Sequence, residues 1–252
     1  MKNISYLMGV LLMLFFNQIS FAQGEPTSGI KKFSHAVTLG YNLGATAPFS
    51  LPNTIREINS YQLLFTPSIG YEVKRHFNDR WGIGGGIQFG IKGMKVTDSV
   101  QYFHTILTME DGQFEGDFSG TNQTQVYNAY LVVPLYGVYQ SKLWSFKLGG
   151  YLAYAMSKRF KGFVADGYIR KGNSLGGKVL IDKSSFDFSN EMKDWDWGVY
   201  AGVGRRFDAN WSVNFNVQLG LEPIFPDSFK GVGYKLRNIY TNIAASYNLG
   251  SF

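Results

Sequence analysis

Six charged residues occupy polar positions in segments where apolar and polar residues alternate. They are Glu72, Lys74, Lys92, Lys147, Arg206 and Glu222. Alternate residues of a strand share one face, so charged residues on several strands can meet inside a closed sheet. In a narrow interior, mixed charges form ion pairs and hydrogen bonds that fill the space. We therefore predict a structural polar network in a lumen, with a charged conduit for a solute as the other interpretation.

The chain offers few groups for catalysis. A serine hydrolase needs a histidine beside a serine and a carboxylate, and the three histidines are His35, His76 and His104. His104 lies among serine and acidic residues at 96–124, but this segment is too long for its sequence to establish contact. The chain has no cysteine, and the stretch EDGQFEGD at 110–117 misses the spacing of a calcium-binding EF-hand. We predict no catalytic residue, no metal site and no cofactor.

Strands must position the charged residues, because the alternation around them has the period of a strand. The clearest segment is RFDANWSVNFNVQLGLE, at 206–222. Apolar residues occupy every second position from Trp211 to Leu221, and polar or small residues fill the positions between. Side chains of a strand alternate between two faces. This segment therefore has one apolar face and one polar face.

Seven segments fit this pattern of alternation, and an eighth, at 125–140, is apolar at nearly every position and contains Pro134 but is also predicted to be a strand. The eight are residues 34–44, 61–75, 80–95, 125–140, 143–157, 194–207, 211–224 and 237–249. Three connections are short polar turns that end on tryptophan, at 77–81, 140–144 and 207–211. Four connections are long, at about 45–60, 96–124, 158–193 and 225–236. Short turns that alternate with long loops are typical of outer-membrane barrels, in which the short turns face the periplasm.

We therefore predict an all-β fold, an eight-stranded antiparallel up-and-down transmembrane β-barrel. The apolar faces would meet lipid and the polar faces a small lumen, and closure would pair every backbone N–H and C=O inside the hydrocarbon. No run of about 18 apolar residues follows residue 22, so the sequence predicts no membrane-spanning helix. The alternative is a soluble sandwich or lipocalin-like barrel that buries its apolar faces in a core.

The five tryptophans fall at the ends of predicted strands. Trp81, Trp144 and Trp211 begin strands at the end with the short turns, and Trp195 and Trp197 begin a strand at the opposite end. Indole rings favour the boundary between lipid headgroups and hydrocarbon. We predict two interfacial aromatic girdles.

The N-terminus has the pattern of a secretory signal. Lys2 is basic, residues 7–16 are apolar, and Ser20-Phe21-Ala22 places small residues at positions −3 and −1 of a cleavage site. We predict a signal peptide at 1–22, a short periplasmic segment at 23–33 and a barrel domain at 34–252. The mature protein would then lie in the cell outer membrane, after cleavage near Ala22.

Tyr130 is followed by the sequence Leu131-Val132-Val133-Pro134-Leu135. This stretch resembles the YLEIPL-type motif of Bacteroidota outer-membrane β-barrel proteins, the PorT-like family. The resemblance extends to the Ala22–Gln23 junction, the strand layout and the aromatic terminal residue Phe252, so it covers the whole mature chain. Val132 departs from the motif, in which an acidic residue is common at this position. The resemblance implies an outer-membrane barrel, and one branch of the family is similar to an accessory of type IX secretion.

Two long connections carry opposite charge. Residues 98–122 contain five acidic and no basic residues, and residues 158–193 contain eight basic and four acidic residues. Opposite charges attract, and basic groups bind the phosphates of anionic lipids. We predict that the two segments approach each other and that the basic one contacts outer-membrane lipid, including lipopolysaccharide.

These features favour a non-enzymatic outer-membrane protein, a scaffold that binds a partner or lipid through long extracellular loops. An accessory role in secretion or envelope assembly, with a protein partner there, is the finer hypothesis. A narrow channel for small or apolar solutes is the first alternative, and a membrane-embedded lipid hydrolase or protease is the second. The formal charge of +6 is scattered along an exported chain, so nucleic acid is not a predicted partner.

Overall fold

The computed structural model describes residues 33–109, 112–172 and 175–251. Its strands are β1 (Phe33–Ala47), β2 (Ile55–Leu63), β3 (Pro67–His76), β4 (Trp81–Met109), β5 (Gly112–Ser141), β6 (Trp144–Ser157), β7 (Phe160–Lys171), β8 (Lys178–Asp187), β9 (Trp195–Arg206), β10 (Trp211–Gly220) and β11 (Arg237–Ser251), and η2 (Ser189–Glu191) is a 3-10 helix. The predicted signal peptide, and the predicted segment 23–33 except Phe33, lie outside the described residues. Within the described part, no helix is both long and apolar enough to cross a membrane.

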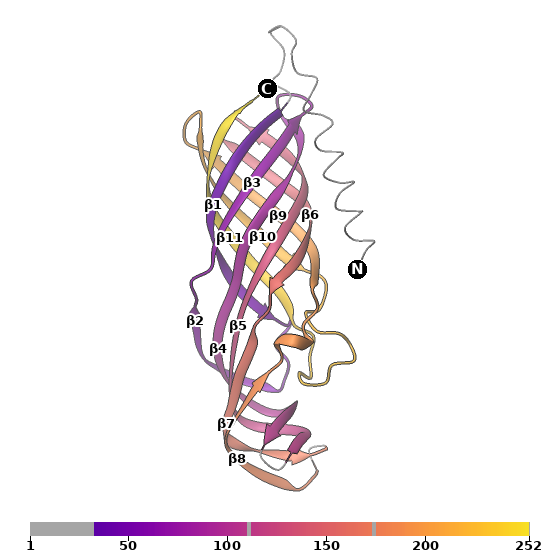
Figure 1. Ribbon diagram of the computed structural model, residues 1–252. Helices are drawn as coiled ribbons and strands as arrows, with labels where there is room; N and C mark the ends of the chain where they lie inside the picture. Colours follow the sequence, from indigo (N-terminus) through magenta and orange to yellow (C-terminus); the bar gives the residue numbers. More distant parts are fainter. Residues whose placement is uncertain (1–32, 110–111, 173–174, 252) are drawn as a thin grey trace.

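A closed antiparallel ring forms the body of the molecule. Neighbouring strands pair in the order β4-β3-β1-β11-β10-β9-β6-β5, and pairing between β4 and β5 closes the ring. The first and last strands are sealed by pairs that run from Ser34–Ser251 to Ala47–Arg237. Figure 1 shows these strands wound around a barrel, with the C-terminus at the rim where β1 begins. The predicted all-β antiparallel barrel fold is confirmed.

The three short turns lie at one rim, between β3 and β4, β5 and β6, and β9 and β10. Two of them share one local mechanism. The side-chain oxygen of Asn78 accepts hydrogen bonds from the backbone N–H groups of Arg80 and Trp81, at 2.9 and 2.8 Å. Asp208 accepts in the same way from Asn210 and Trp211, at 2.7 Å each. Such side-chain caps let asparagine and aspartate close tight turns, so the similar sequences FNDRW and FDANW give similar turns.

The two faces of β10 have different environments, as its alternation predicts. Trp211 and Phe215 are 50% and 46% exposed on the outside, whereas Asn214 and Asn216 are 4% and 6% exposed in the lumen. Apolar residues form a lipid-facing band on a membrane barrel. The apolar face of the strand is therefore the outer face, and the polar face lines the lumen.

The tryptophans lie at two levels of the barrel wall. At the short-turn rim, the rings of Trp81 and Trp211 contact Tyr139 and Tyr247, with centroids 4.9 and 5.0 Å apart. At the other level, Trp195 pairs with Tyr154, with ring centroids 5.0 Å apart. Trp144 opens β6 at the short-turn rim, and Trp197 follows Trp195 on β9. All five indoles are exposed on the outside of the ring.

Beyond the ring, the sheet continues into an extension at the end opposite the C-terminus (Figure 1). We call extension the following parts: β2, residues 93–109 of β4, residues 112–127 of β5, β7, β8 and segment 221–236. In it, β2 pairs with β4, β7 pairs with β5, and β8 pairs with β7. The acidic and basic segments thus lie side by side as paired strands, with Asp117 opposite Arg170.

The strand count differs from the predicted eight: eight strands form the ring, and three more, β2, β7 and β8, lie in the extension, where three of the four predicted long loops contain strands. The structure has eleven strands among its described residues, and the predicted strand 61–75 is interrupted between β2 and β3. Irregular positions explain the difference. Tyr102 in β4 and Asp166 in β7 have positive φ angles of 55° and 51°, and the register shifts beside Tyr102. A bulge moves the following side chains to the other face, so the alternation of period two is lost.

Candidate functional site

Glu72 is the centre of a buried ion cluster in the lumen near the short-turn rim. Its Oε1 accepts a hydrogen bond of 2.6 Å from Lys147 Nζ and a second one from the Tyr136 hydroxyl. Its Oε2 lies 2.9 Å from Lys74 Nζ, and the Tyr136 ring stacks on Tyr200 at 5.3 Å. We call these five residues the Glu72 cluster. It joins three of the six charged residues that the alternation assigned to the lumen.

The Glu72 cluster depends on a glycine of the neighbouring strand. A Cβ atom at Gly84 would lie 2.5 Å from the ring of Tyr136. That distance is far below a carbon–carbon contact, so only glycine leaves room for the tyrosine ring that reaches Glu72. The alternate glycines of β4 therefore have a packing role at this position.

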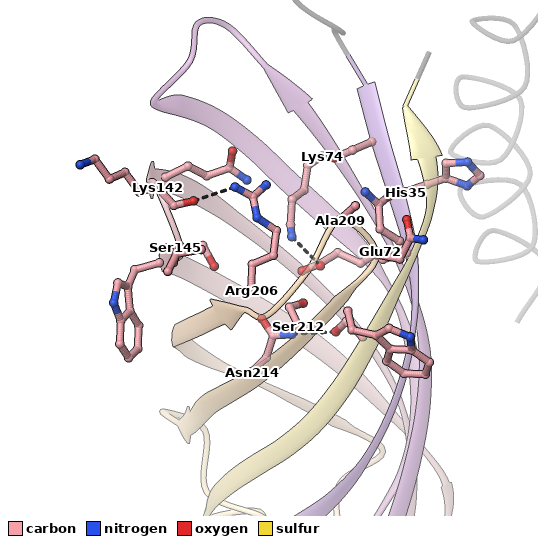
Figure 2. Close-up of a pocket in the computed structure, with 18 residues that line it drawn as sticks. His35, Glu72, Lys74, Lys142, Ser145, Arg206, Ala209, Ser212 and Asn214 are labelled. Atoms are coloured by element: carbon pink, nitrogen blue, oxygen red, sulfur yellow. Dashed lines mark hydrogen bonds and ion pairs between the residues drawn. The ribbon is translucent and has the colours of Figure 1, made fainter.

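A pocket of about 110 Å³ opens above the Glu72 cluster at the short-turn rim. Figure 2 shows Lys74 directed at Glu72, and Arg206 directed at the carbonyl of Lys142, to which it donates a hydrogen bond of 2.7 Å. Arg206 is exposed and lines the mouth of the pocket. Arg206, the last residue of β9, therefore lines the same pocket as Glu72 and Lys74 but hydrogen-bonds to the rim and not to the Glu72 cluster.

Lys92 occupies a second buried cluster, deeper in the lumen. Its Nζ lies 3.5 Å from Asp196 Oδ2, which also accepts hydrogen bonds from the Tyr151 hydroxyl and Asn238 Nδ2, at 3.0 Å each. The ammonium group lies 5.0 to 5.7 Å from the ring centroids of three tyrosines, Tyr130, Tyr151 and Tyr240. Aromatic faces attract a desolvated cation, so the lysine is compensated by one carboxylate and three rings.

Asp196 was missed as a site residue, although its position contained a signal. It stands between Trp195 and Trp197, and therefore on the lumen face. Glu222 was assigned to the lumen on the same logic, but β10 ends at Gly220 and the chain leaves the wall. Glu222 instead forms an ion pair with Lys193, outside the barrel strands. Its observed partner is therefore not a member of either lumen cluster.

An apolar plug forms the part of the extension that adjoins the lumen clusters. Its buried members come from β4, β5, β7 and the segments before β9 and β11: Met94, Val126, Phe160, Met192, Ile224, Phe225 and Leu236. Segment 221–236 contains no strand and contributes three of these side chains. The plug covers the end of the lumen that lies opposite the short turns.

The extension also contains a cavity of about 260 Å³, lined in part by the plug residues Met94, Phe160 and Leu236. We call it the Asp98 pocket, because among the described residues Asp98 on β4 is the one carboxyl group that lines it. Asn122, which is opposite Asp98 in the β4–β5 pairing, donates a hydrogen bond of 3.0 Å to Asp98 Oδ1. Burial raises the pKa of the Asp98 carboxyl to about 6, although the Asn122 hydrogen bond favours the charged form. Tyr234 lines the same cavity. Its pKa is raised mainly by burial, and the negative charge of Asp98 raises it further.

Neither His104 nor His76 forms the constellation of a serine hydrolase with the described residues. His104 has carboxylates at both ring nitrogens, with Asp117 3.0 Å from Nδ1 and Glu115 3.2 Å from Nε2. His76 Nε2 contacts Ser34 Oγ at 2.9 Å, but none of the described carboxylates forms an ion pair with this histidine. A triad needs one histidine that joins a serine to a carboxylate. Among the described residues, neither of these two histidines joins a serine to a carboxylate.

The comparisons with known proteins concern the barrel as a whole. The family described as "Outer membrane protein beta-barrel domain" matches residues 21–226. No curated protein matches the chain. Two crystal structures of Ail, the attachment invasion locus protein of Yersinia pestis, are similar to it. The complex with the heparin analogue sucrose octasulfate has 11% identity and a TM-score of 0.35 over 86% of this chain and 99% of that chain. The other has 12% identity and a TM-score of 0.31 over 88% of this chain and 100% of that chain.

The Glu72 cluster yields a prediction about stability. Lys147→Met should lower the free energy of unfolding by about 3 kcal/mol, because it removes one partner of a buried ion pair. The double variant Glu72→Gln with Lys147→Met should lose less than the sum of the two single variants. Urea unfolding of protein refolded in phospholipid vesicles measures both. Lys142→Met at the exposed rim is the control, and equal stability of the two lysine variants would contradict the prediction.

The Asp98 pocket yields a prediction about pH. Because the folded carboxyl has a raised pKa, ionising it destabilises the fold, and stability should fall as pH rises from about 4 to about 6. The full cost, about 3 kcal/mol, is present above pH 6. Asp98→Asn should therefore slow hydrogen exchange of β4 and β5 in the extension at pH 7.5. It should also remove the pH dependence of the local stability, which is obtained from the exchange rates after correction for the intrinsic rate at each pH. Asp182→Asn, at an exposed site on β8, is the control; an unchanged pH dependence in Asp98→Asn would refute this account.

Proposed function

The chain belongs to the outer membrane protein beta-barrel domain family, and we propose that it is a non-enzymatic binding protein of the outer membrane. In this proposal the barrel anchors the extension, and the extension binds a partner or lipid outside the cell. The observation that carries it is the continuation of β4 and β5, of 29 and 30 residues, far beyond the ring. A strand crosses the bilayer in about 9–11 residues. More than half of each strand therefore serves a structure outside the membrane.

The orientation follows from the connections. Outer-membrane barrels have short turns in the periplasm and long connections outside the cell. The three short turns lie at the same rim of the barrel as the start of β1 and the end of β11, and the extension lies at the opposite end of the barrel. The five tryptophans then form the two interfacial girdles, one at each membrane boundary.

The filled lumen favours a role of the barrel as a membrane anchor over a role as a channel. The Glu72 cluster, the Lys92–Asp196 cluster and the apolar plug occupy successive levels of the interior. Eight-stranded rings have an interior that side chains nearly fill. The charged residues of the lumen are therefore a structural network, and the channel alternative has no supporting observation in the described part of the chain. The hydrolase alternative also lacks support, because both nitrogens of His104 contact carboxylates.

The finer parts of the proposal rest on the sequence. They are cleavage of a signal peptide at Ala22, membership of the PorT-like branch in Bacteroidota, and an accessory role in secretion or envelope assembly. Contact with outer-membrane lipid, including lipopolysaccharide, rests on the exposed basic residues of β8, among them Lys178 and Lys183. Nucleic acid is not a proposed partner, and no cofactor is proposed.

The orientation can be tested by cysteine labelling, because the natural chain has no cysteine. Asp182→Cys on β8 should react with a membrane-impermeant maleimide on intact cells, since the proposal places it outside. Ala209→Cys, in a short turn, should react only after the outer membrane is permeabilised. Labelling in the reverse pattern would invert the orientation and remove the basis for an extracellular binding surface.

The closed lumen predicts that the purified protein does not conduct ions. After incorporation into planar lipid bilayers, we expect no conductance steps above the leak of the lipid, because buried side chains occupy each level of the interior. Protein recovered from the same lipid and shown to resist urea serves as the control for folded insertion. Reproducible steps from such protein would favour the channel alternative.

A further inference from the structure

The Asp98 pocket has the size and lining of a binding site for a small molecule. It lies between the end of β1, the inner face of β4 and β5, and segment 221–236. Four phenylalanines line it: Phe103, Phe160, Phe186 and Phe188. An apolar cavity of about 150 Å³ holds benzene. A cavity of about 260 Å³ therefore has room for a ligand of roughly ten non-hydrogen atoms.

One buried acceptor in the pocket, the side-chain oxygen of Asn122 beside Asp98, lacks a donor among the described residues. Asp98 and Asn122 are each only 4% exposed. The Asn122 amide donates to Asp98, but its Oδ1 is buried and has no hydrogen-bond partner among the described residues. A buried polar atom without a partner costs about 1–3 kcal/mol. A donor supplied by a ligand would recover this cost.

The charge of the pocket is also uncompensated. No lysine, arginine or histidine lines it, and Asp98 takes part in no ion pair among the described residues. This differs from the lumen, where Glu72 and Asp196 both have lysine partners. Buried carboxylates are normally paired with a cation. The missing partner at Asp98 is therefore a positive charge.

We propose that the Asp98 pocket binds a small apolar primary amine. Its ammonium group would donate hydrogen bonds to Asp98 and to Asn122 Oδ1, and its apolar body would pack against the phenylalanines. An ammonium group carries three donors and a full charge, which fits two adjacent acceptors. A carboxylate ligand would be repelled by the negative charge of Asp98, and a neutral alcohol would leave that charge unpaired.

The test uses three probes with similar bodies, which are phenethylamine, phenethyl alcohol and phenylacetate. Isothermal titration calorimetry with the full chain in detergent micelles should show that the amine binds at least about tenfold more tightly than the alcohol, because a charge-assisted hydrogen bond is the stronger one. Phenylacetate should not bind. Asp98→Asn should lose about tenfold in amine affinity and keep its affinity for the alcohol.

Two further variants make the outcome decisive. Asp182→Asn, on the exposed face of β8, should bind the amine as the parent does. Ala47→Phe, which places a ring in the cavity, should weaken both the amine and the alcohol. Equal affinity for amine and alcohol, full amine affinity in Asp98→Asn, or no binding of any probe up to millimolar concentration would each overturn the proposal. This inference deepens the proposed binding function, but its failure would leave the cysteine-labelling result and the outward orientation untouched.

Discussion

Backbone hydrogen bonding inside the bilayer is the constraint on which the structure depends. Hydrocarbon offers no partner for an N–H or C=O group, so a sheet that crosses it must close on itself. Pairing of β4 with β5, and of β1 with β11, removes both free edges of the ring. Even Pro134, which has no N–H, leaves only a local gap in the β4–β5 ladder, between the pairs Gly85–Leu135 and Gln88–Val132.

Closure has a consequence for the interior. A narrow ring brings polar faces close together and keeps water scarce, so each charge in it needs compensation. Glu72 is compensated by two lysines and a tyrosine, and Lys92 by Asp196 and three aromatic rings. Gly84, on the neighbouring strand, leaves room for the ring of Tyr136, which donates a hydrogen bond to Glu72. The barrel is thereby a filled and rigid anchor.

The extension is released from this constraint. Beyond the bilayer, water can satisfy unpaired backbone groups, so the sheet can have free edges at β2 and β8. It also accepts bulges at Tyr102 and Asp166, which curve the strands. Its interior is apolar, yet it retains Asp98, a carboxyl beside which the described part of the chain places no cation. A buried group whose pKa is shifted and whose charge is unpaired is characteristic of functional sites.

The barrel, its short-turn rim and the outward direction of its apolar faces were determined by the sequence alone, because alternation reports the face of every residue in a regular strand. Asn78 and Asp208, each three residues before a tryptophan, marked two of the turns. Alternation does not report which strands are neighbours or at which level two side chains meet. The pairing of Lys92 with Asp196 therefore required the register of the whole ring.

Three further features also required the tertiary structure. Arg206 and Glu222 have the parity of lumen residues, but they lie at strand ends, where the chain turns away from the wall. The strands of the extension escaped prediction because bulges interrupt their alternation. The Asp98 pocket is formed by segments far apart in the chain, from Ala45 to Leu236, and only folding brings its apolar walls around one carboxyl group. Local pattern decides the face of a residue, whereas register and packing decide its partners.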